Sequence, residues 1–322
     1  MSSDPFSDIL RLTRARGVLS TGLRAKGRFA VRVEMHDGMK FNAVTEGACF
    51  LDVDGHESYN LQSGDCFLLT RATPFTVGND RSSRVLSAER VFADATAGFA
   101  QLDNGVGPSV TFVGGRMTSD RNMEFLTSSL PPVLLLRART ATAVWIRGLL
   151  LRLEAELTEA RPGAEIICEE IMHMIFLEMI RSHANDGQAV GWIAALSDPQ
   201  IVKALSAMHA APGKHWRVGD LASMSGLSRS QFAVRFARVV GEPPLEYLTR
   251  WRMTLAREAL RDRTATIAQV ANDVGYGSEA AFGAAFKRVY GTSPRRSVDG
   301  DRVVEPQHDA ARLDSGRTAG RI

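Results

Sequence analysis

A repeat in the C-terminal third of the chain constrains the fold more than any other feature. The segment "LASMSGLSRSQFAVRFARVVGEPP" begins at Leu221, and "VANDVGYGSEAAFGAAFKRVYGTSP" begins at Val270. From the phenylalanines onward the copies align at an offset of 50 residues, and upstream the offset is 49. The matched pairs of the second half are Phe232 with Phe282, Phe236 with Phe286, Arg238 with Arg288, Val239 with Val289, Gly241 with Gly291, and Pro244 with Pro294. Such a repeat predicts one supersecondary unit that occurs twice.

Each copy has the pattern of two helices joined by a turn. A glycine, Gly226 or Gly275, supplies the positive φ of the turn, and a serine, Ser228 or Ser278, is suited to cap the second helix. Phenylalanines at positions i and i+4 mark the buried face of that helix, and a glycine followed by a proline ends it. This pattern predicts a helix-turn-helix, whose second helix can lie in the DNA major groove.

Two further helices are expected around the repeat. "PPLEYLTRWRMTLAREALRDR" is amphipathic and lies between the copies, so it predicts a continuous linking helix that presents both units to one face of DNA. Upstream, "DPQIVKALSAMHAAPG" predicts a helix with Asp198 as its N-cap and Pro199 in its first turn.

With these motifs, residues 198–298 resemble the DNA-binding domain of the AraC/XylS family of transcription regulators. The resemblance is carried by "RWRMTLAREAL" and by "IAQVANDVGYGSEAAFGAAFKRVYGTSPRR". It implies binding to double-stranded promoter DNA, with RNA polymerase as a further partner. Whether such a protein activates or represses transcription is not encoded in any motif.

Helical geometry around Phe232 indicates which residues of the first recognition helix face outward. Positions that match the family's base-reading sites are Ser230, Ala233 and Val234, with Arg229 and Gln231 beside them; Arg238 belongs to the same outer face. Gln pairs well with adenine and Arg with guanine, while Ala and Val methyl groups can contact thymine. Arg229 and Arg235 can equally be solvated or neutralise phosphates.

The outward face of the second recognition helix is expected to be mostly alanine up to Lys287. Its members are Glu279, Ala280, Ala281, Ala284, Lys287 and Arg288. Alanine offers no hydrogen bond through its side chain, so this copy is predicted mainly to anchor, helped by Arg295 and Arg296. The charge of Glu279 is expected to stabilise the helix N-terminus rather than to accept a hydrogen bond from cytosine.

The charge distribution agrees with a DNA-binding C-terminal part but does not establish it. Residues 214–302 contain 15 Lys or Arg against nine Asp or Glu, whereas residues 1–213 contain 21 against 24. A basic segment of this size can also be a solvated surface.

Residues 29–119 contain short β-type runs separated by turns such as Asp54-Gly55 and Ser63-Gly64-Asp65. Closely spaced strands of this kind predict a sandwich or small barrel. Their order resembles the cupin-like sensor domain of many AraC relatives, so the predicted fold class is α+β with two domains. Asn42 and Phe75 stand where metal-binding cupins place histidines, so no metal and no cofactor are expected.

A small-molecule effector could still bind inside this domain. The candidate lining residues are Phe41, Asn42, Phe50, Phe67 and Phe75, and each aromatic can equally be plain core. His36 and His56 lie beside turns and are interpreted as surface residues.

The predicted domains are 1–190, with a barrel at about 17–119 and helices at about 140–184, and 198–298; 303–322 is a disordered tail. The second of the helices at about 140–184, "AEIICEEIMHMIFLEMIRSHA", has more apolar surface than one sheet face requires. Its neighbour or a second subunit would cover the excess, so a homodimer is one option.

Three functions remain in competition: a regulator, an enzyme fused to a DNA-binding tail, and a barrel that only dimerises. Cys49, Cys66 and Cys168 are scattered and form no metal or disulfide pattern, which favours buried reduced thiols. No hydrolase, zinc-protease or phosphate-loop motif occurs, and no run of about 20 apolar residues predicts a membrane span. A cytoplasmic, non-enzymatic regulator is the favoured interpretation.

Overall fold

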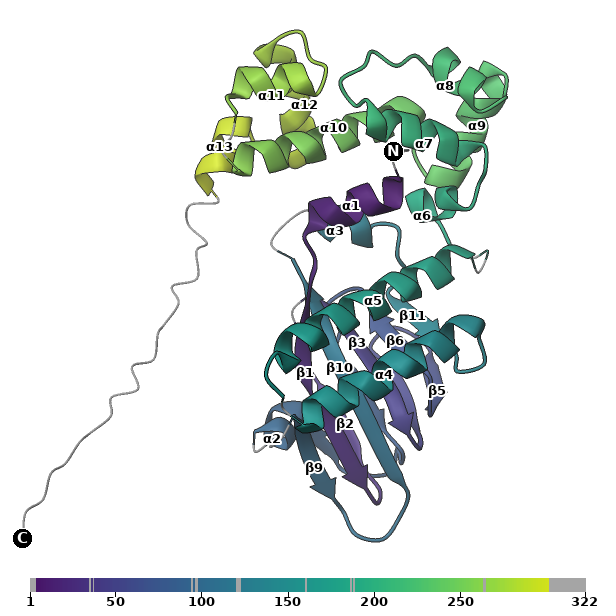
Figure 1. The fold of residues 1–322 in the computed structure, drawn as a ribbon, viewed down its shortest axis with the longest axis vertical. Coiled ribbons are helices and arrows are strands. Elements are labelled where there is room, and N and C mark those ends of the chain that lie inside the picture. Colours follow the sequence, from purple (N-terminus) through teal and green to yellow (C-terminus); the bar gives the residue numbers. More distant parts are fainter. Residues whose placement is uncertain are drawn as a thin grey trace, which may run out of the picture. The chain divides into compact units, whose positions relative to one another are not determined.

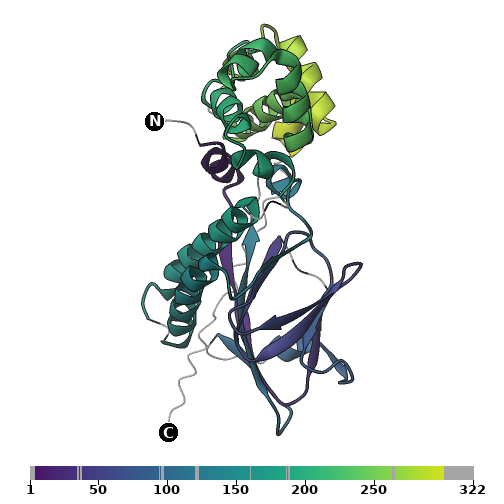
Figure 2. The ribbon, with the colours of Figure 1, turned by 90° about the vertical axis from the view of Figure 1, so that its right-hand side faces the viewer.

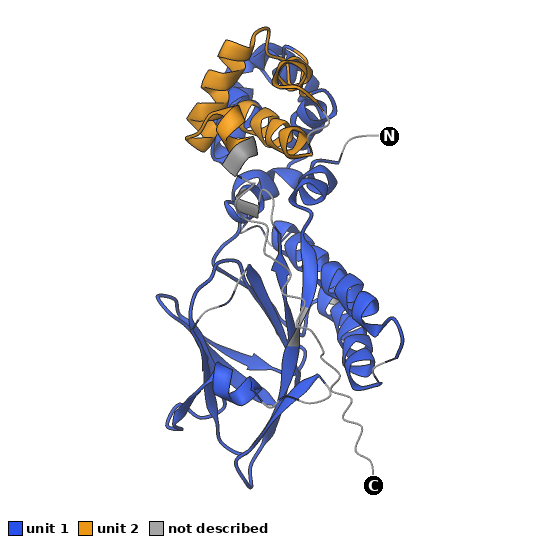
Figure 3. Cartoon of the chain, turned by 90° about the vertical axis from the view of Figure 1, so that its left-hand side faces the viewer, with its two compact units in different colours: residues 1–211, 215–248 blue, residues 212–214, 249–322 orange. Residues whose placement is uncertain are grey.

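A computed structural model describes residues 4–300 except 35, 37, 94, 96, 97, 120–122, 160, 186, 188, 263 and 264 (Figure 1). The chain divides into two compact units, one of residues 1–211 and 215–248 and the other of 212–214 and 249–322 (Figure 3). Each unit therefore contains one copy of the repeat. The domain limits expected from the sequence were set by its motifs, whereas these units are defined by compactness, so the expected limits stay a prediction. The tail at 303–322 lies outside the described residues.

The N-terminal part forms two β-sheets. One has the strand order β11-β6-β3-β10-β1-β9, and the other has the order β5-β4-β7-β2-β8. The strands are β1 (Arg16–Lys26), β2 (Ala30–Val33), β3 (Met39–Glu46), β4 (Ala48–Val53), β5 (Ser58–Gln62), β6 (Cys66–Leu69), β7 (Phe75–Gly78), β8 (Val85–Ser87), β9 (Phe99–Asp103), β10 (Ser109–Thr118) and β11 (Val133–Leu136). The β-rich domain and the helical C-terminal part confirm the expected α+β class. Strand β11 was not expected from the sequence.

Alternation along the strands separates two faces of the larger sheet. In β3, Met39 and Phe41 are fully buried, whereas the intervening Lys40 and Asn42 are only partly buried and point the opposite way. Between the sheets lies a core that includes Leu51, Phe67 and Val77. The turn glycines Gly55 and Gly64 have φ of 76° and 90°, as expected for glycines in turns.

Two long helices cover the other face of the six-stranded sheet (Figure 2). These are α4 (Ala141–Glu159) and α5 (Ala164–Asn185). Helix α5 approaches the sheet closely where glycines leave room: a Cβ atom on Gly17 would lie 2.8 Å from the Glu169 carbonyl oxygen, and one on Gly115 would lie 2.5 Å from the Met172 methyl carbon.

These helices keep an uncovered apolar surface, as the composition of α5 suggested. Ile171, Ile175 and Met179 are buried. Other large apolar side chains of the two helices are exposed: Val144, Trp145, Leu151, Ile166, Ile167 and Met174. Trp145, for example, has 78% of its surface exposed. We call these six residues the α4–α5 patch.

Shorter helices complete the N-terminal unit: α1 (Pro5–Thr13), α2 (Ala88–Phe92), α3 (Met123–Thr127), α6 (Gly191–Leu196) and α7 (Ile201–Ala210). A chain of ring contacts links them to the first copy of the repeat. Phe125 lies 6.3 Å from Trp192 and 6.1 Å from Tyr247, and Tyr247 lies 6.0 Å from Phe236. Tyr247 also shares a hydrogen bond of 2.8 Å with His209. The first copy thus shares its core with residues from far earlier in the chain.

The repeat region is helical throughout. Its helices are α8 (Val218–Met224), α9 (Arg229–Val240), α10 (Pro244–Arg261), α11 (Ile267–Asp273), α12 (Glu279–Tyr290) and α13 (Pro294–Gly300). The linking helix is continuous, as expected. Pro244 and Pro294 do more than stop the preceding helix, because each is the first residue of the next one. At this position the backbone N–H that proline lacks would have no partner within the helix. Asp198 accepts hydrogen bonds from the amides of Gln200 and Ile201, although α7 itself begins at Ile201.

Candidate nucleic-acid interface and ligand cavity

The start of α9 is fixed by a reciprocal cap. The Ser228 hydroxyl oxygen accepts from the Gln231 amide at 3.3 Å, and the Gln231 side-chain oxygen accepts from the Ser228 amide at 3.2 Å. Both bonds satisfy amides that the first helical turn leaves without partners. Gln231, expected beside the base-reading positions, is therefore occupied in holding the helix start.

The second copy repeats this skeleton. The Ser278 hydroxyl oxygen accepts from the Ala281 amide at 3.2 Å. The ring centroids of the paired phenylalanines are 5.5 Å apart in α9 and 5.7 Å apart in α12. Gly241 and Gly291 end the two helices with φ of 88° and 73°, values that L side chains rarely adopt. The duplication seen in the sequence is thus a duplication of structure.

The expected DNA-facing residues of α9 lie at its surface. Arg229, Ser230, Gln231, Val234 and Arg238 are exposed, and Ala233 is half-buried. Val234 is 70% exposed. We call Arg229, Ser230, Ala233, Val234 and Arg238 the α9 face.

Arg235 belongs to a different environment, which the sequence did not indicate. Its Nε atom donates to Asp198 Oδ2 at 2.9 Å, and only 11% of the Asp198 side chain is exposed. Burial opposes ionisation of Asp198, but the bonds from Arg235 and from two backbone amides hold the pKa of this carboxyl below its ordinary value. Arg235 thus links α9 to Asp198 at the start of α7, and its guanidinium is occupied by this ion pair rather than available to DNA.

On α12 the predicted outward residues are all exposed: Glu279, Ala280, Ala281, Ala284, Lys287 and Arg288. We call them the α12 face. A Cβ atom on Gly283 would meet nothing within 4 Å, which shows how open the middle of this helix is. Arg295 and Arg296 are exposed in the first turn of α13, a helix that the sequence did not predict.

A further arginine of the repeat region is structural. Arg252 of α10 donates to the carbonyl oxygens of Pro212 and Lys214 at 2.7 and 2.8 Å. The same loop presses against the turn of the second copy, because a Cβ atom on Gly213 would lie 2.5 Å from the Asp273 carbonyl oxygen. Not every arginine of this basic region is therefore available to DNA.

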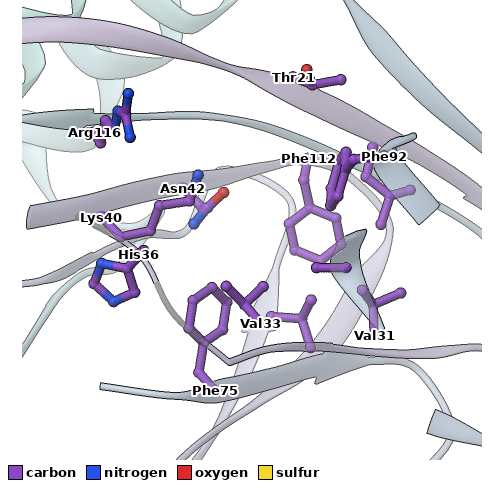
Figure 4. Close-up of a pocket in the computed structure, with 13 residues that line it drawn as sticks. Thr21, Val31, Val33, His36, Lys40, Asn42, Phe75, Phe92, Phe112 and Arg116 are labelled. Carbon is purple, nitrogen blue, oxygen red and sulfur yellow. The ribbon is translucent and has the colours of Figure 1, made fainter. Parts of the chain in front are cut away.

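A cavity of about 380 Å³ lies between the two N-terminal sheets (Figure 4). It is lined by Thr21, Leu23, Val31, Val33, His36, Lys40, Asn42, Phe75, Val77, Ala88, Phe92, Phe112 and Arg116. Its volume falls at the lower end of the range of about 300–1,000 Å³ that is typical of small-molecule sites.

Of the five residues expected to line an effector site, Asn42 and Phe75 line this cavity. Phe41 does not, because strand alternation points it to the opposite face of β3. Phe50 lies under the Arg81 guanidinium, 4.3 Å from its ring centroid, outside the cavity. Phe67 packs edge-on against Phe75 at 6.0 Å and belongs to the core beside the cavity.

The interpretation of His36 as a surface residue was wrong. His36 is half-buried, lines the cavity and lies 6.1 Å from the Phe75 ring. A turn pattern alone does not reveal whether a side chain beside the turn points inward or outward. His56 is exposed, as expected.

The three cysteines are buried and free, as the sequence suggested. Burial, with a smaller contribution from the charge of Asp65, raises the pKa of Cys49 to about 12. A thiol held in this protonated state is a poor nucleophile and metal ligand. Among the described residues, no group of three or more His, Cys, Asp or Glu could hold a metal ion. No helix of the described part combines the length and apolarity needed to cross a membrane.

Comparison with known proteins gives matches over both parts of the chain. A family model described as a cupin matches residues 4–185, and one described as a helix-turn-helix domain matches residues 221–298. A putative AraC-like transcription regulator of Streptomyces lividans is 41% identical over 295 residues, which cover 90% of this chain and 96% of that protein. The HTH-type transcriptional regulator AlkR of Acinetobacter baylyi is 30% identical over 285 residues, which cover 85% of this chain and 92% of AlkR.

A solved structure also matches the C-terminal part. The DNA-binding domain of AdpA, crystallised in complex with a target DNA, is 28% identical to this chain with a TM-score of 0.32. The match covers 34% of this chain and 99% of that one.

Proposed function

This chain belongs to the AraC-like family of transcription regulators, with an N-terminal cupin domain and a C-terminal helix-turn-helix DNA-binding domain, and we propose that its two helix-turn-helix copies divide the recognition of promoter DNA unequally. The observation that carries the proposal is a shared buried skeleton beneath two different exposed faces. The first copy reads bases, and the second mainly anchors.

The α9 face supports base reading because it combines different chemistries. Arg229 can form a bidentate pair with guanine, Ser230 offers a hydroxyl, and the Val234 methyl groups can contact thymine. Gln231 reaches an adenine only by giving up its cap, which costs about 1 kcal/mol of helix stability.

The α12 face supports anchoring. Three of its six residues are alanines, whose small side chains allow the helix backbone to approach the groove closely. Lys287, Arg288, Arg295 and Arg296 then neutralise phosphates, and Glu279 stabilises the helix start.

The cavity between the sheets is the proposed effector site, which is supported by its size and largely apolar walls. Effector binding changes the availability of the DNA-binding helices or the association of subunits, and thereby promoter occupancy. The α4–α5 patch supports a homodimer, since apolar side chains clustered on one surface commonly mark an interface. The protein works in the cytoplasm, where promoter DNA and RNA polymerase are found, and it carries out no enzymatic reaction of its own.

The test is genome-wide footprinting with the full chain, followed by substitution of each base pair in the recovered operator. We expect substitutions in the half protected by α9 to weaken binding by about 1–3 kcal/mol each, and those in the other half by less. Arg229→Ala changes the first turn of α9, and Ala281→Ser changes the first turn of α12. The base pairs at which each variant alters binding show which half of the operator each helix contacts. Equal intolerance of both halves, or greater intolerance in the α12 half, contradicts the division.

Ligand-induced thermal stabilisation separates sensing from a barrel that only dimerises. A specific effector raises the melting temperature by mass action, whereas a barrel without a ligand site responds to no small molecule.

A further inference from the structure

The cavity between the N-terminal sheets has two chemically distinct ends. In Figure 4, Lys40, Arg116 and His36 gather at one end, and Phe92, Phe112 and Val31 lie at the other. Phe75 lies between the two groups. None of the described residues that line the cavity carries a carboxylate. The site thus combines a cationic end with an apolar body.

The two cations are neighbours in the sheet. Lys40 of β3 and Arg116 of β10 are register partners, and both side chains line the cavity. Like charges directly opposite each other on one sheet face repel. Burial lowers the pKa of Lys40 to about 8, and the charge of Arg116 adds to the shift. Two basic side chains therefore lie side by side at one end of the cavity, an arrangement that suits an anionic group.

Asn42 adds a hydrogen-bond donor at the same end. Its side-chain Nδ2 atom is buried and has no hydrogen-bond partner. Leaving a buried donor unsatisfied costs about 1–3 kcal/mol, and a bound acceptor group would remove this cost. The position opposite in the sheet is Gly114, where a Cβ atom would lie 2.3 Å from Asn42 Oδ1. Glycine at this position gives the amide room to lie against the cavity wall.

We infer that the cavity binds an organic carboxylate with an apolar body, its carboxylate held by Lys40, Arg116 and Asn42 and its body packed against Phe75, Phe92 and Phe112. The two basic side chains match a carboxylate in charge, and the guanidinium can bind it through two parallel hydrogen bonds. The volume admits one compact molecule and excludes a dinucleotide-sized ligand. This inference rests on the proposed effector site and specifies its chemistry.

The experiment uses the full chain and probes that share one body and differ in head group. These are 3-phenylpropanoate, 3-phenylpropanol and 3-phenylpropylamine, with acetate as a charge that lacks the body. Titration calorimetry and thermal shift measure their binding. We expect the acid to bind roughly tenfold or more tightly than the alcohol, and acetate and the amine to bind weakest. An acid that binds no better than the alcohol overturns the inference.

Variants then assign the two ends. Lys40→Met and Arg116→Met should each reduce the affinity for the acid roughly tenfold and leave that for the alcohol unchanged. Phe92→Ala should weaken both ligands equally. Lys26→Met, an exposed cation of β1 outside the cavity, is the matched control and should change neither. Thermal unfolding of each variant without ligand shows whether it is folded, so that loss of binding is not confused with unfolding. Retention of acid affinity in both cationic variants contradicts the inference.

Operator binding measured with and without 3-phenylpropanoate separates this inference from the proposed function. Binding of the acid without any change in operator affinity supports the ligand class and contradicts effector control. Intact operator binding with no preference for the acid contradicts the ligand class alone.

Discussion

The two helix-turn-helix copies can be compared residue by residue, because Phe, Gly and Ser occupy matching places in both. Phe232 and Phe236 pack as Phe282 and Phe286 do, with centroid separations of 5.5 and 5.7 Å. The exposed positions differ: Arg229, Ser230 and Val234 correspond to Glu279, Ala280 and Ala284. The buried residues specify the motif, and the exposed ones are left to determine what it binds. The two copies also pack against different parts of the chain: the first contacts Phe125 and Asp198 through Tyr247 and Arg235, and the second lies against the loop at 212–214.

The largest expected effect tests the shared skeleton. Phe236→Ala and Phe286→Ala each remove a fully buried ring, and each should cost about 3–5 kcal/mol of unfolding free energy in its own unit. Denaturant unfolding combined with amide hydrogen exchange of α9 and α12 measures both. Val234→Ala, at an exposed site, should stay within about 0.5 kcal/mol of the natural chain. Tolerance of the substitution in one copy only would break the comparison.

The next effect is specific to the first copy. Arg235→Ala removes the main partner of Asp198 and should cost about 1–3 kcal/mol, whereas Ala285 in the second copy has no such role. The pKa of Asp198 lies below its ordinary value of 3.8, so the pair stabilises the fold above that pH and loses its effect as the pH falls through the folded-state pKa.

The stability difference between the natural chain and Arg235→Ala should therefore be full at neutral pH and shrink below about pH 4. Thermal unfolding at a series of pH values checks this. A difference that persists unchanged at pH 3 would assign the effect to packing of the arginine stem.

A third prediction concerns close approach to DNA. Ala284→Leu adds bulk to the middle of the α12 face and should reduce operator affinity about tenfold, or about 1.4 kcal/mol, with little effect on stability. Ala284→Ser, which adds only a hydroxyl, is the control and should reduce affinity far less. Gel-shift titration at fixed salt measures both. Unchanged affinity in Ala284→Leu would mean that this face lies away from the groove.

The smallest effect is on salt dependence. Arg238→Ala should lower the slope of log affinity against log salt by about 1, and the double substitution of Lys287 and Arg288 by alanine should lower it by about 2. The contrast arises because the second copy has two exposed cations at the end of its recognition helix and the first has one. Lys26→Ala, on a strand of the N-terminal sheets, should leave the slope unchanged. Equal slopes for both variants would remove the proposed difference in anchoring.

The helix-turn-helix copies could be predicted from the sequence because their signals are local. A positive-φ glycine, a capping serine and phenylalanines four residues apart each act within one or two turns of helix. The strand alternation of the N-terminal part is equally local, so the α+β class was also predictable.

What could not be predicted depends on residues that are distant in the chain. Arg235 meets Asp198 across 37 positions, and Phe125 meets Tyr247 across more than a hundred. His36 lines the cavity although it lies beside a turn, and Phe50 lies outside the cavity because of the face on which its strand places it. The sequence also identified Phe75 and Asn42 as lining residues but not Lys40 and Arg116. These two lie opposite each other only because of the register between β3 and β10, which pairs residues far apart in the chain.

Because each recognition helix carries its own start and stop, its surface can change without disturbing its fold. Ser228 and Gly241 delimit α9, and Ser278 and Gly291 delimit α12, so the exposed positions between them are open to substitution by selection or by design. A duplicated gene segment of this kind can acquire a new operator preference in one half while the other keeps the protein on its promoter. Transplanting Arg229, Ser230, Ala233 and Val234 onto the equivalent positions of α12 would place the same reading surface in both halves of the operator.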